Sequence, residues 1–404
     1  MRIAFDAKRA YCNFTGLGNH SRTTLDILTQ YYPENDYLLY TPKIKQNEVT
    51  SPYLHHPLLK TLQPTGMVKG GLWRTFRLAH DVRCAKADVF HGLSNELPVG
   101  IRRSGVPSVV TIHDVAFKTF TEMYHWQDRQ IYDMKWRYAV RHADRIIAIS
   151  QCTKQDILRF YDVEADKIDV VYQPVSPYYY ERAEKMLSMG DEKMTQQFFE
   201  NRLASFQKNS SVFSEMLQRE VSEPFMLYVG SINSRKNLLG AVKALEMLPA
   251  SVRIPLLIVG GGREYKREVE QYVSEHGLQP WCRFLSNVSN EQLQQLYAMA
   301  RLFVYPSFYE GFGLPLVEAR LSGCPVISSN VSSLPEAAGS HALLVDPNDT
   351  EALSKAMDSL ITDDKLHDTL AVETMKEAMT TLHPKVLAAQ LMSVYEGIGK
   401  STSQ

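Results

Sequence analysis

Two glutamates, Glu310 and Glu318, flank the glycine-rich turn of the run YEGFGLPLVEA. The sequence predicts a buried strand before this turn and a helix after it, beginning at Leu314. The free N–H groups and positive dipole end of such a helix favour a diphosphate. Gly311 and Gly313 would let that ligand approach the backbone closely, because they carry no Cβ. We therefore expect Glu318 to accept hydrogen bonds from a ribose diol and Glu310 to reach sugar hydroxyls.

Two cations stand in a similar strand–turn–helix context in the run LYVGSINSRKNLLGAV. A strand is expected to end at Val229, and Gly230 and Ser231 turn the chain toward a helix that starts near residue 237. This order places Arg235 and Lys236 at the carboxyl end of the strand. A diphosphate leaving group gains negative charge as its bond to a sugar breaks, and fixed cations can stabilise that charge without a metal.

The first half of the chain carries further polar groups at expected strand ends. The loop NFTGLGNHSR follows the first strand, and its Gly16 suits a backbone that closes over phosphates or a sugar. His113 and Asp114 follow the run VVTI; we expect Asp114 to orient His113 or the next turn. The run HGLSNELP, with Asn95, is predicted either to meet an acceptor or to form a simple turn.

The helices and strands that would position these residues can be predicted from the pattern of apolar runs. Short runs rich in β-branched residues alternate with longer amphipathic stretches, which predicts buried parallel strands joined by helices. The predicted strands of the first half are 3–5, 37–40, 89–90, 108–112, 145–149 and 169–172. Those of the second half are 225–229, 256–259, 283–285, 302–305, 326–327 and 343–345. Because ligands bind outside the carboxyl ends of such strands, we expect an α/β fold of two doubly wound, Rossmann-like domains facing each other across a cleft.

The 404 residues divide in the prediction as follows. Residues 1–175 form an acceptor-side domain, and residues 224–384 form a nucleotide-sugar domain. Between them, residues 176–223 are rich in Glu, Gln, Lys and Met and are expected to be a helical insertion or linker. Residues 385–404 are expected to form a last helix.

The run YEGFGLPLVEA resembles the donor signature of retaining GT-B glycosyltransferases of the group 1, or family-four, class. The runs GCPVISSNVSSLPE and GSINSRKNL are similar to that class too, and the resemblance covers the chain except for the segment 176–223. It implies that Glu310 contacts the transferred sugar and Glu318 the ribose. It implies that Arg235 and Lys236 bind the diphosphate, although Ser231 stands where some members have an arginine.

The resemblance also implies roles for backbone and loop residues. The amides after Glu310 would contact the sugar and diphosphate; they belong to Gly311, Phe312, Gly313 and Leu314. The backbone at Val288 would border the base, His113 would approach the sugar, and the last helix would pack back on the first domain. The implied reaction is hexosyl transfer from a nucleotide sugar. The version of the motifs in this chain looks most like mannosyltransferases, which makes GDP-mannose the first donor to test, while UDP- and ADP-linked sugars stay open.

Composition argues against several other classes of protein. A net charge of -1 argues against a nucleic-acid partner, and five scattered cysteines support neither a disulfide framework nor a metal cluster. No acidic pair stands at a strand end, so no metal and no cofactor beyond the nucleotide sugar is expected. No apolar run reaches the length of a membrane helix. We therefore expect a cytoplasmic enzyme, at the inner face of the membrane if its acceptor is a lipid-linked glycan.

The run GGLWRTFRLAHDVRCAK, at residues 70–86, has two interpretations. A basic amphipathic helix of this kind can lie on a membrane surface. A crossover helix that packs on its own sheet has the same pattern, and it is the interpretation that we favour.

Retention at the anomeric carbon has two routes, and the sequence offers no obvious carboxylate nucleophile for a double displacement. Front-face attack, with the leaving phosphate accepting the proton, is the expected route. Three alternatives stay open: a sugar-nucleotide epimerase of the same fold, a non-catalytic nucleotide-sugar-binding protein, and an NAD dehydrogenase. The last lacks the G-x-G-x-x-G fingerprint, because residues 263–265 interrupt the run IVGGGREY.

Overall fold

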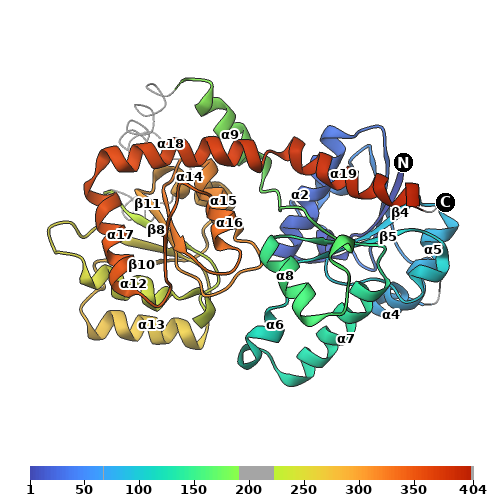
Figure 1. Ribbon diagram of the computed structural model, residues 1–404, viewed down its shortest axis with the longest axis horizontal. Helices are drawn as coiled ribbons and strands as arrows, with labels where there is room; N and C mark the ends of the chain where they lie inside the picture. The colour runs from blue at the N-terminus through green and yellow to red at the C-terminus, as the bar shows by residue number, and fades with distance from the viewer. Residues whose placement is uncertain (67, 191–222, 402–404) are drawn as a thin grey trace. The chain divides into compact units, whose positions relative to one another are not determined.

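The computed structural model describes residues 1–66, 68–190 and 223–401 (Figure 1). The chain forms two compact units: Met1–Ser176 together with Leu382–Gln404, and Pro177–Thr381. The predicted segment 176–223 begins with α9 (Pro177–Leu187), which packs on α15 (Leu314–Leu321) and α18 (Asp364–Thr381) of the second unit. The rest of that predicted insertion, beyond residue 190, lies outside the described residues.

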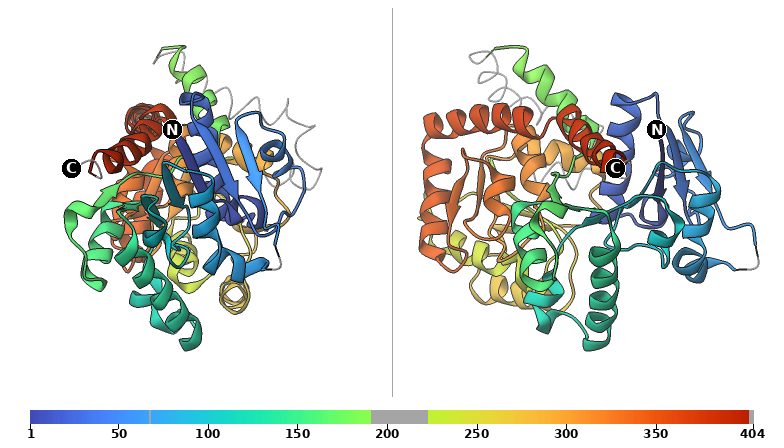
Figure 2. Two further views of the ribbon diagram at one scale, coloured as in Figure 1. Left: turned by 90° about the vertical axis from the view of Figure 1, so that its right-hand side faces the viewer. Right: turned by 45° about the vertical axis from the view of Figure 1, so that its right-hand side comes forward.

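The first unit is built on a seven-stranded parallel sheet with the order β3-β2-β1-β4-β5-β6-β7. Helices lie on both faces of this sheet (Figures 1 and 2). The strands are β1 (Arg2–Asp6), β2 (Asp36–Tyr40), β3 (Leu59–Leu62), β4 (Val89–Gly92), β5 (Ser108–Ile112), β6 (Arg145–Ala148) and β7 (Ile168–Val170). The helices are α1 (Lys8–Cys12), α2 (Gly16–Tyr31), α3 (Ser51–Leu54), α4 (Gly70–Phe76), α5 (Leu78–Cys84), α6 (Ala116–Thr119), α7 (Trp126–His142), α8 (Gln151–Phe160) and α19 (Pro384–Ser401). Three short 3-10 turns complete the unit: η1 (Ile101–Ser104), η2 (Thr121–Met123) and η3 (Ala165–Lys167).

The second unit has a six-stranded parallel sheet with the order β10-β9-β8-β11-β12-β13. Its strands are β8 (Met226–Val229), β9 (Leu256–Val259), β10 (Cys282–Leu285), β11 (Leu302–Tyr305), β12 (Val326–Ser329) and β13 (Leu343–Val345). Its other helices are α12 (Leu238–Met247), α13 (Glu264–Glu275), α14 (Asn290–Met299), α16 (Leu334–Ala338) and α17 (Thr350–Thr362), with the 3-10 turn η4 (Ser234–Lys236). The prediction of two doubly wound parallel sheets is confirmed.

Every predicted run forms a strand, but β3 was not predicted. It is an edge strand with the sequence LKTL, and only Leu59 in it is buried. A strand that buries one side chain has no apolar run by which to find it.

The favoured interpretation of residues 70–86 as one buried helix is wrong in two respects. The chain bends at Arg77 into α4 and α5, and Leu72 and Phe76 are exposed. On one straight helix Trp73 and Leu78 would point about 140° apart. The bend lets both pack into the same core cluster, and the indole N–H of Trp73 donates to Asp81 at 2.7 Å.

The last helix, α19, packs on α2 of the first unit. Leu387, Leu391 and Tyr395 belong to the core cluster that contains Ile3 and Phe5 of β1. The hydroxyl of Tyr395 also shares a hydrogen bond of 2.7 Å with His91 Nδ1 on β4. The C-terminal residues therefore complete the core of the N-terminal unit.

Candidate active site

The predicted diphosphate cations and the loop glutamate meet at one point of the second sheet. β9 and β10 lie on one side of β8 and β11 lies on the other, so the strand order reverses between β8 and β11. Arg235 and Lys236 follow β8, and Glu310 follows β11. In open α/β sheets the ligand site lies at this switch point, outside the carboxyl ends of the strands.

Glu310 is held by both cations. Its Oε2 lies 3.0 Å from Nη1 of Arg235, and its Oε1 lies 2.8 Å from Nζ of Lys236. The hydroxyls of Tyr305 and Ser307 donate to the same Oε1 at 3.1 and 3.2 Å. The two ion pairs bring Arg235 and Lys236 to Glu310, which lies up to 75 positions away in the sequence.

The electrostatics of this cluster favour an anionic ligand. Burial alone would raise the pKa of Glu310, but the charges and hydrogen bonds of Lys236 and Arg235 outweigh it and lower this pKa to about 2. Two cations and one carboxylate leave an excess of one positive charge, and all three side chains are mostly buried. Charges out of water act strongly on an anion that enters between them.

Position 230 favours glycine because the Lys236 side chain packs against it. Its φ is +152°, and a Cβ at this position would lie 3.3 Å from both Cδ and Nζ of Lys236. The lysine therefore occupies the space that a side chain would take. Ser231, the next residue, is exposed and accepts a hydrogen bond of 3.1 Å from the side-chain amide of Asn233.

The turn after Glu310 leads into the amino end of α15, as predicted. Gly313 caps the helix with a φ of +119°, which favours glycine, so it has a backbone role besides any contact with a ligand. The hydroxyl of Ser333 braces the turn by donating to the carbonyls of Glu310 and Phe312 at 2.8 and 2.9 Å. The Phe312 side chain is buried, so only its backbone can serve a ligand.

Glu318 lies in α15 beside Tyr179 of α9 and Tyr297 of α14. Burial among these groups raises its pKa to about 7. Val288 is half-buried in the loop between β10 and α14, which follows the carboxyl end of β10. Contacts of Glu318 with ribose and of Val288 with a base stay predictions.

We expect Glu318→Gln to stabilise the free protein at pH 8. Between the ordinary pKa of 4.5 and the raised value of about 7, the unfolded chain ionises this carboxyl while the fold resists ionisation. The raised pKa thus contributes stability at low pH that is lost as pH rises through 7. The gain at pH 8 should be about 3 kcal/mol, with much less change at pH 5. Thermal melts at both pH values measure it, with Glu351→Gln, at an exposed position of α17, as the control.

The same variant should bind a nucleoside diphosphate about tenfold more weakly, because a glutamine offers one acceptor oxygen and no charge to a diol. Calorimetric titration measures this affinity. An unchanged affinity in Glu318→Gln would remove the ribose assignment, whatever the melting data show.

In the first unit, His113 is buried and fully hydrogen-bonded. Its Nε2 lies 2.8 Å from the carbonyl oxygen of Leu93, and the side-chain amide of Gln173 donates to Nδ1 at 2.9 Å. Burial lowers the pKa of His113 to about 4, so the ring is neutral near pH 7. The structure fixes its orientation; its contact with a sugar stays a prediction.

Asn95 and Asp114 have local partners in the structure. The side-chain oxygen of Asn95 accepts the backbone N–H of His113 at 2.7 Å, and Asp114 accepts that of Ala116 at 3.1 Å. Both residues therefore shape turns, in agreement with the alternative that the sequence left open. Acceptor binding by either stays a prediction.

Gly16 is the first residue of α2, and a Cβ there would meet nothing within 4 Å. Its neighbour Gly18 is the one that the fold requires, because a Cβ there would lie 1.8 Å from the carbonyl oxygen of Asn13. The open surroundings of Gly16 are compatible with the predicted contact to a ligand.

Sequence reasoning missed the residues that hold the predicted site side chains within each unit: Tyr305, Ser307, Ser332, Ser333 and Tyr297 in the second unit, and Gln173 beside His113 in the first. Ser332 and Ser333 stand in the run SSNVSSLPE that carries part of the resemblance, which is the one signal that could have found them. Tyr305 and Ser307 stand just before Glu310, whereas Tyr297 and Gln173 are distant in the sequence from the Glu318 and His113 side chains that they contact.

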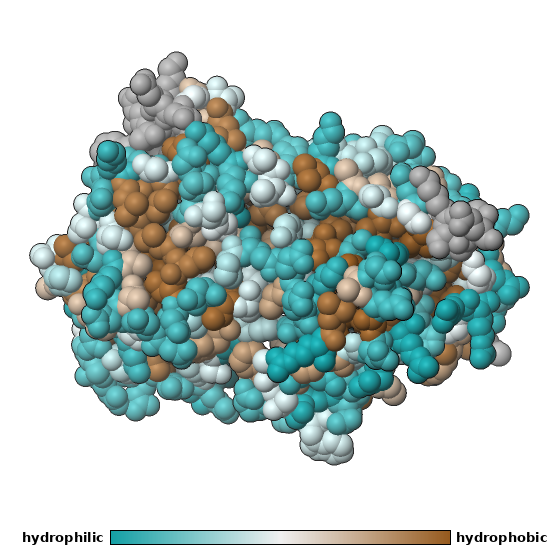
Figure 3. All heavy atoms as spheres, in the orientation of Figure 1, coloured by the Kyte–Doolittle hydropathy of each residue, from teal (hydrophilic) through white to brown (hydrophobic). Residues whose placement is uncertain are grey.

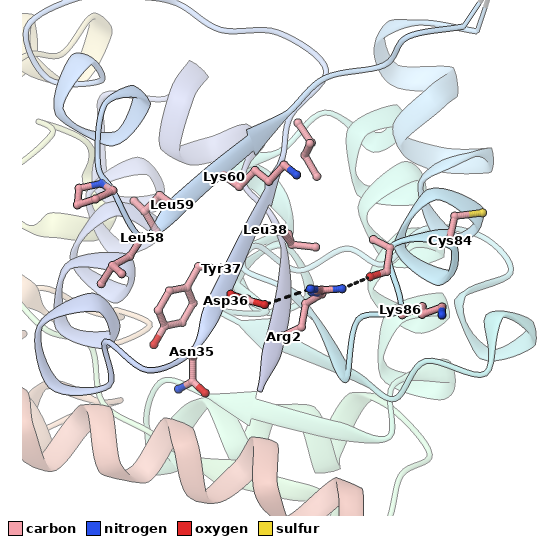
Figure 4. Close-up of a pocket in the computed structure, with 13 residues that line it drawn as sticks. Arg2, Asn35, Asp36, Tyr37, Leu38, Leu58, Leu59, Lys60, Cys84 and Lys86 are labelled. Atoms are coloured by element: carbon pink, nitrogen blue, oxygen red, sulfur yellow. Dashed lines mark hydrogen bonds and ion pairs between the residues drawn. The ribbon is translucent and has the colours of Figure 1, made fainter.

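A hollow of about 540 Å³ lies elsewhere in the first unit (Figure 4). It is lined by Arg2, Asp36, Leu58 and Lys60, at the amino ends of β1, β2 and β3. The Arg2 guanidinium is already bound to Asp36 at 3.2 Å and to the carbonyl of Ala85 at 2.9 Å. A ligand site of a doubly wound sheet is expected at the opposite edge.

Among residues 1–66, 68–190 and 223–401, no three His, Cys, Asp or Glu side chains cluster as metal ligands would. In the same ranges, no helix combines the length and the apolar character needed to cross a membrane.

Two family models match the chain. The model of glycosyl transferases group 1 matches residues 212–376, and that of glycosyltransferase family 4 matches residues 25–178. Among solved structures, Anabaena HepE in complex with UDP and glucose covers 98% of this chain and 100% of its own, with a TM-score of 0.68 at 18% identity. WaaG, a glycosyltransferase involved in lipopolysaccharide biosynthesis, covers 98% of this chain with a TM-score of 0.65 at 17% identity.

The O-antigen chain mannosyltransferase B of Escherichia coli is 30% identical over 391 residues, which are 94% of this chain and 95% of the relative. The O-antigen chain mannosyltransferase RfbU of Salmonella typhimurium is 26% identical over 62% of this chain and 60% of its own length. The predicted resemblance is confirmed: the chain belongs to the group 1, family-four glycosyltransferases and has their GT-B fold.

Proposed function

We propose that this glycosyltransferase moves mannose, with retention and without a metal, from GDP-mannose to a glycan or lipid-linked acceptor in polysaccharide biosynthesis in the cytoplasm. The observation that carries the proposal is the cluster of Arg235, Lys236 and Glu310 at the β8/β11 switch point. It offers two cations for a diphosphate and one carboxylate for sugar hydroxyls. The donor and the class of acceptor are proposed from the names of the O-antigen mannosyltransferases among the relatives.

In the proposed reaction the bond between the anomeric carbon and the β-phosphate oxygen breaks, and the acceptor hydroxyl oxygen attacks from the same face. The hydroxyl proton passes to the leaving phosphate oxygen, so the products are the mannosylated acceptor and GDP. Arg235 and Lys236 would stabilise the charge that develops on the diphosphate. The helix dipole of α15 would add to that stabilisation.

Glu310 is suited to accept hydrogen bonds and not to act as an acid. With a pKa of about 2 it stays ionised throughout the neutral range. We propose that it binds hydroxyls of the transferred sugar and balances the two cations before the donor arrives.

We expect GDP to raise the melting temperature of the protein more than UDP, ADP or NAD at equal concentration, because a ligand that binds the folded state stabilises it by mass action. The transfer assay that follows uses GDP-mannose with mannose-terminated glycan acceptors, with and without EDTA, and reads the anomeric configuration of the product by NMR. Inversion would exclude the retaining mechanism, and loss of turnover in EDTA would exclude metal independence. Release of an epimerised sugar nucleotide without acceptor would favour the epimerase alternative.

A further inference from the structure

One surface of the first unit, which we name the α4 patch, combines exposed apolar residues with unpaired cations. Its apolar members are Val68, Leu72, Phe76 and Val99, and its cations are Lys69, Arg102 and Arg103. Leu72 and Phe76 are 65% and 64% exposed, which is unusual for large apolar side chains next to each other on a helix.

The members of the patch are neighbours in space. Leu72 and Phe76 are four residues apart on α4 and therefore lie on the same face, and Val68 lies just before the start of that helix. The backbone N–H of Val99 donates to the carbonyl of Thr75 at 2.7 Å, which places Val99 beside Phe76. The turn η1, with Arg102 and Arg103, follows Val99 directly and packs on α5.

Exposed apolar residues occur over both units (Figure 3), so exposure alone does not mark a docking surface. More than half of the large apolar side chains that the described part of the chain exposes lie between residues 68 and 134. They include Trp126, Ile131 and Met134 on α7. The Glu96 carboxylate pairs with Arg74 of α4 and with Lys135 of α7. Two helices of the first unit, α4 and α7, thus carry exposed large apolar side chains.

The charges around the patch are complementary to an anionic surface. Lys69, Arg102 and Arg103 are exposed and make no ion pair with the described residues. Arg77, at the end of α4, lies 3.6 Å from Asp81. A cluster of free cations around apolar side chains is the composition with which amphipathic helices bind anionic lipid.

The opposite face of α4 is tied to the functional edge of the first sheet. Arg74 lies about 200° around the helix from both Leu72 and Phe76. It is buried and donates to Asp6 at the end of β1 and to Glu96 after β4, at 2.6 and 2.5 Å. These two strands flank the point where the order of the first sheet reverses. The thickness of one helix, about 10 Å, thus separates the patch from the edge where a doubly wound sheet binds its ligand.

We propose that the α4 patch binds a membrane surface rich in anionic lipid, with Leu72 and Phe76 inserted among the headgroups and Lys69, Arg102 and Arg103 paired with their phosphates. This contact would bring the carboxyl edge of the first sheet to the lipid surface. The inference does not depend on the proposed donor or on retention, and its test does not use turnover.

The test is co-sedimentation of the full chain with vesicles of phosphatidylethanolamine and phosphatidylglycerol, compared with vesicles of phosphatidylcholine alone. We expect at least tenfold tighter binding to the anionic vesicles, weakened by salt. Leu72→Ser/Phe76→Ser and Arg102→Ser/Arg103→Ser should each reduce that binding at least tenfold. Met247→Ser, which removes an exposed apolar side chain of the second unit, should leave it unchanged.

Equal binding of wild type and both double variants to anionic vesicles would overturn the proposal, as would a wild type that binds neither kind of vesicle. A wild type that dimerises through Leu72 and Phe76, shown by analytical ultracentrifugation of both forms, would replace the membrane with a second copy of the chain. The variants should keep the melting temperature and the thermal shift with GDP. A failure of GDP to shift any form would count against the proposed function and leave the vesicle result standing.

Discussion

Lys236→Met should lower the free energy of unfolding by roughly 3 kcal/mol, because it leaves part of the buried Glu310 charge uncompensated. The lysine ammonium lies 2.8 Å from the glutamate and is itself buried beside Gly230. The variant should also bind GDP ten to a hundredfold more weakly, because a charged hydrogen bond to a diphosphate is lost. Chemical denaturation and calorimetric titration measure the two effects.

The control for this prediction is the double variant Lys236→Met/Glu310→Gln, which removes both members of the pair. It should regain most of the stability and none of the GDP affinity. The low pKa of Glu310, about 2, contributes stability above pH 4.5 that is lost as pH falls toward 2. Acid unfolding of Lys236→Met should therefore begin at a higher pH than that of wild type. A single variant as stable as wild type would show that Arg235 alone satisfies the carboxylate.

Glu310→Gln should preserve GDP binding while it slows transfer of the sugar to the acceptor. The two cations lose their protein counter-ion, so we expect GDP to bind at least as tightly as in wild type and to raise the melting temperature by more. Transfer to the acceptor should fall about 10²–10³-fold, since a carboxylate that holds the sugar in the transition state is replaced by a neutral amide. Thermal shifts with GDP and initial rates with GDP-mannose measure both.

Glu351→Gln on α17 is the matched control, because this exposed carboxylate pairs with Lys355 and not with a cation of the site. Weaker GDP binding in Glu310→Gln would mean that the glutamate organises the two cations for the diphosphate. Unchanged transfer would exclude Glu310 from the reaction.

The sequence predicted the strands that bury a continuous apolar run and failed where burial is partial. β8, β9 and β11 have almost wholly apolar sequences, and each was found. β3 lies at the sheet edge with one buried residue, and α4 and α5 read as one helix because their bend at Arg77 serves tertiary packing. Such features depend on neighbours that a local pattern does not contain.

The site was predicted from strand ends and turns, which bring Arg235, Lys236 and Glu310 to one edge of a sheet. Their direct ion pairing was not predicted, because the switch point between β8 and β11 depends on strand order. The opposite shifts of the pKa values of Glu310 and Glu318 were not predicted either, because they depend on neighbours that only the fold brings together. One carboxylate has cations as neighbours and the other has tyrosines.

The packing of α19 on the first unit has a consequence for the order in which the protein is made. Residues 177–381 form the second unit, and they are inserted between two parts of the first. A ribosome therefore completes the second unit before it releases Leu387, Leu391 and Tyr395, which fill the first core. Domains usually fold in the order of synthesis, N-terminal first. Here the nascent N-terminal unit stays incomplete, with its α19-binding apolar surface uncovered, until α19 itself has been synthesised.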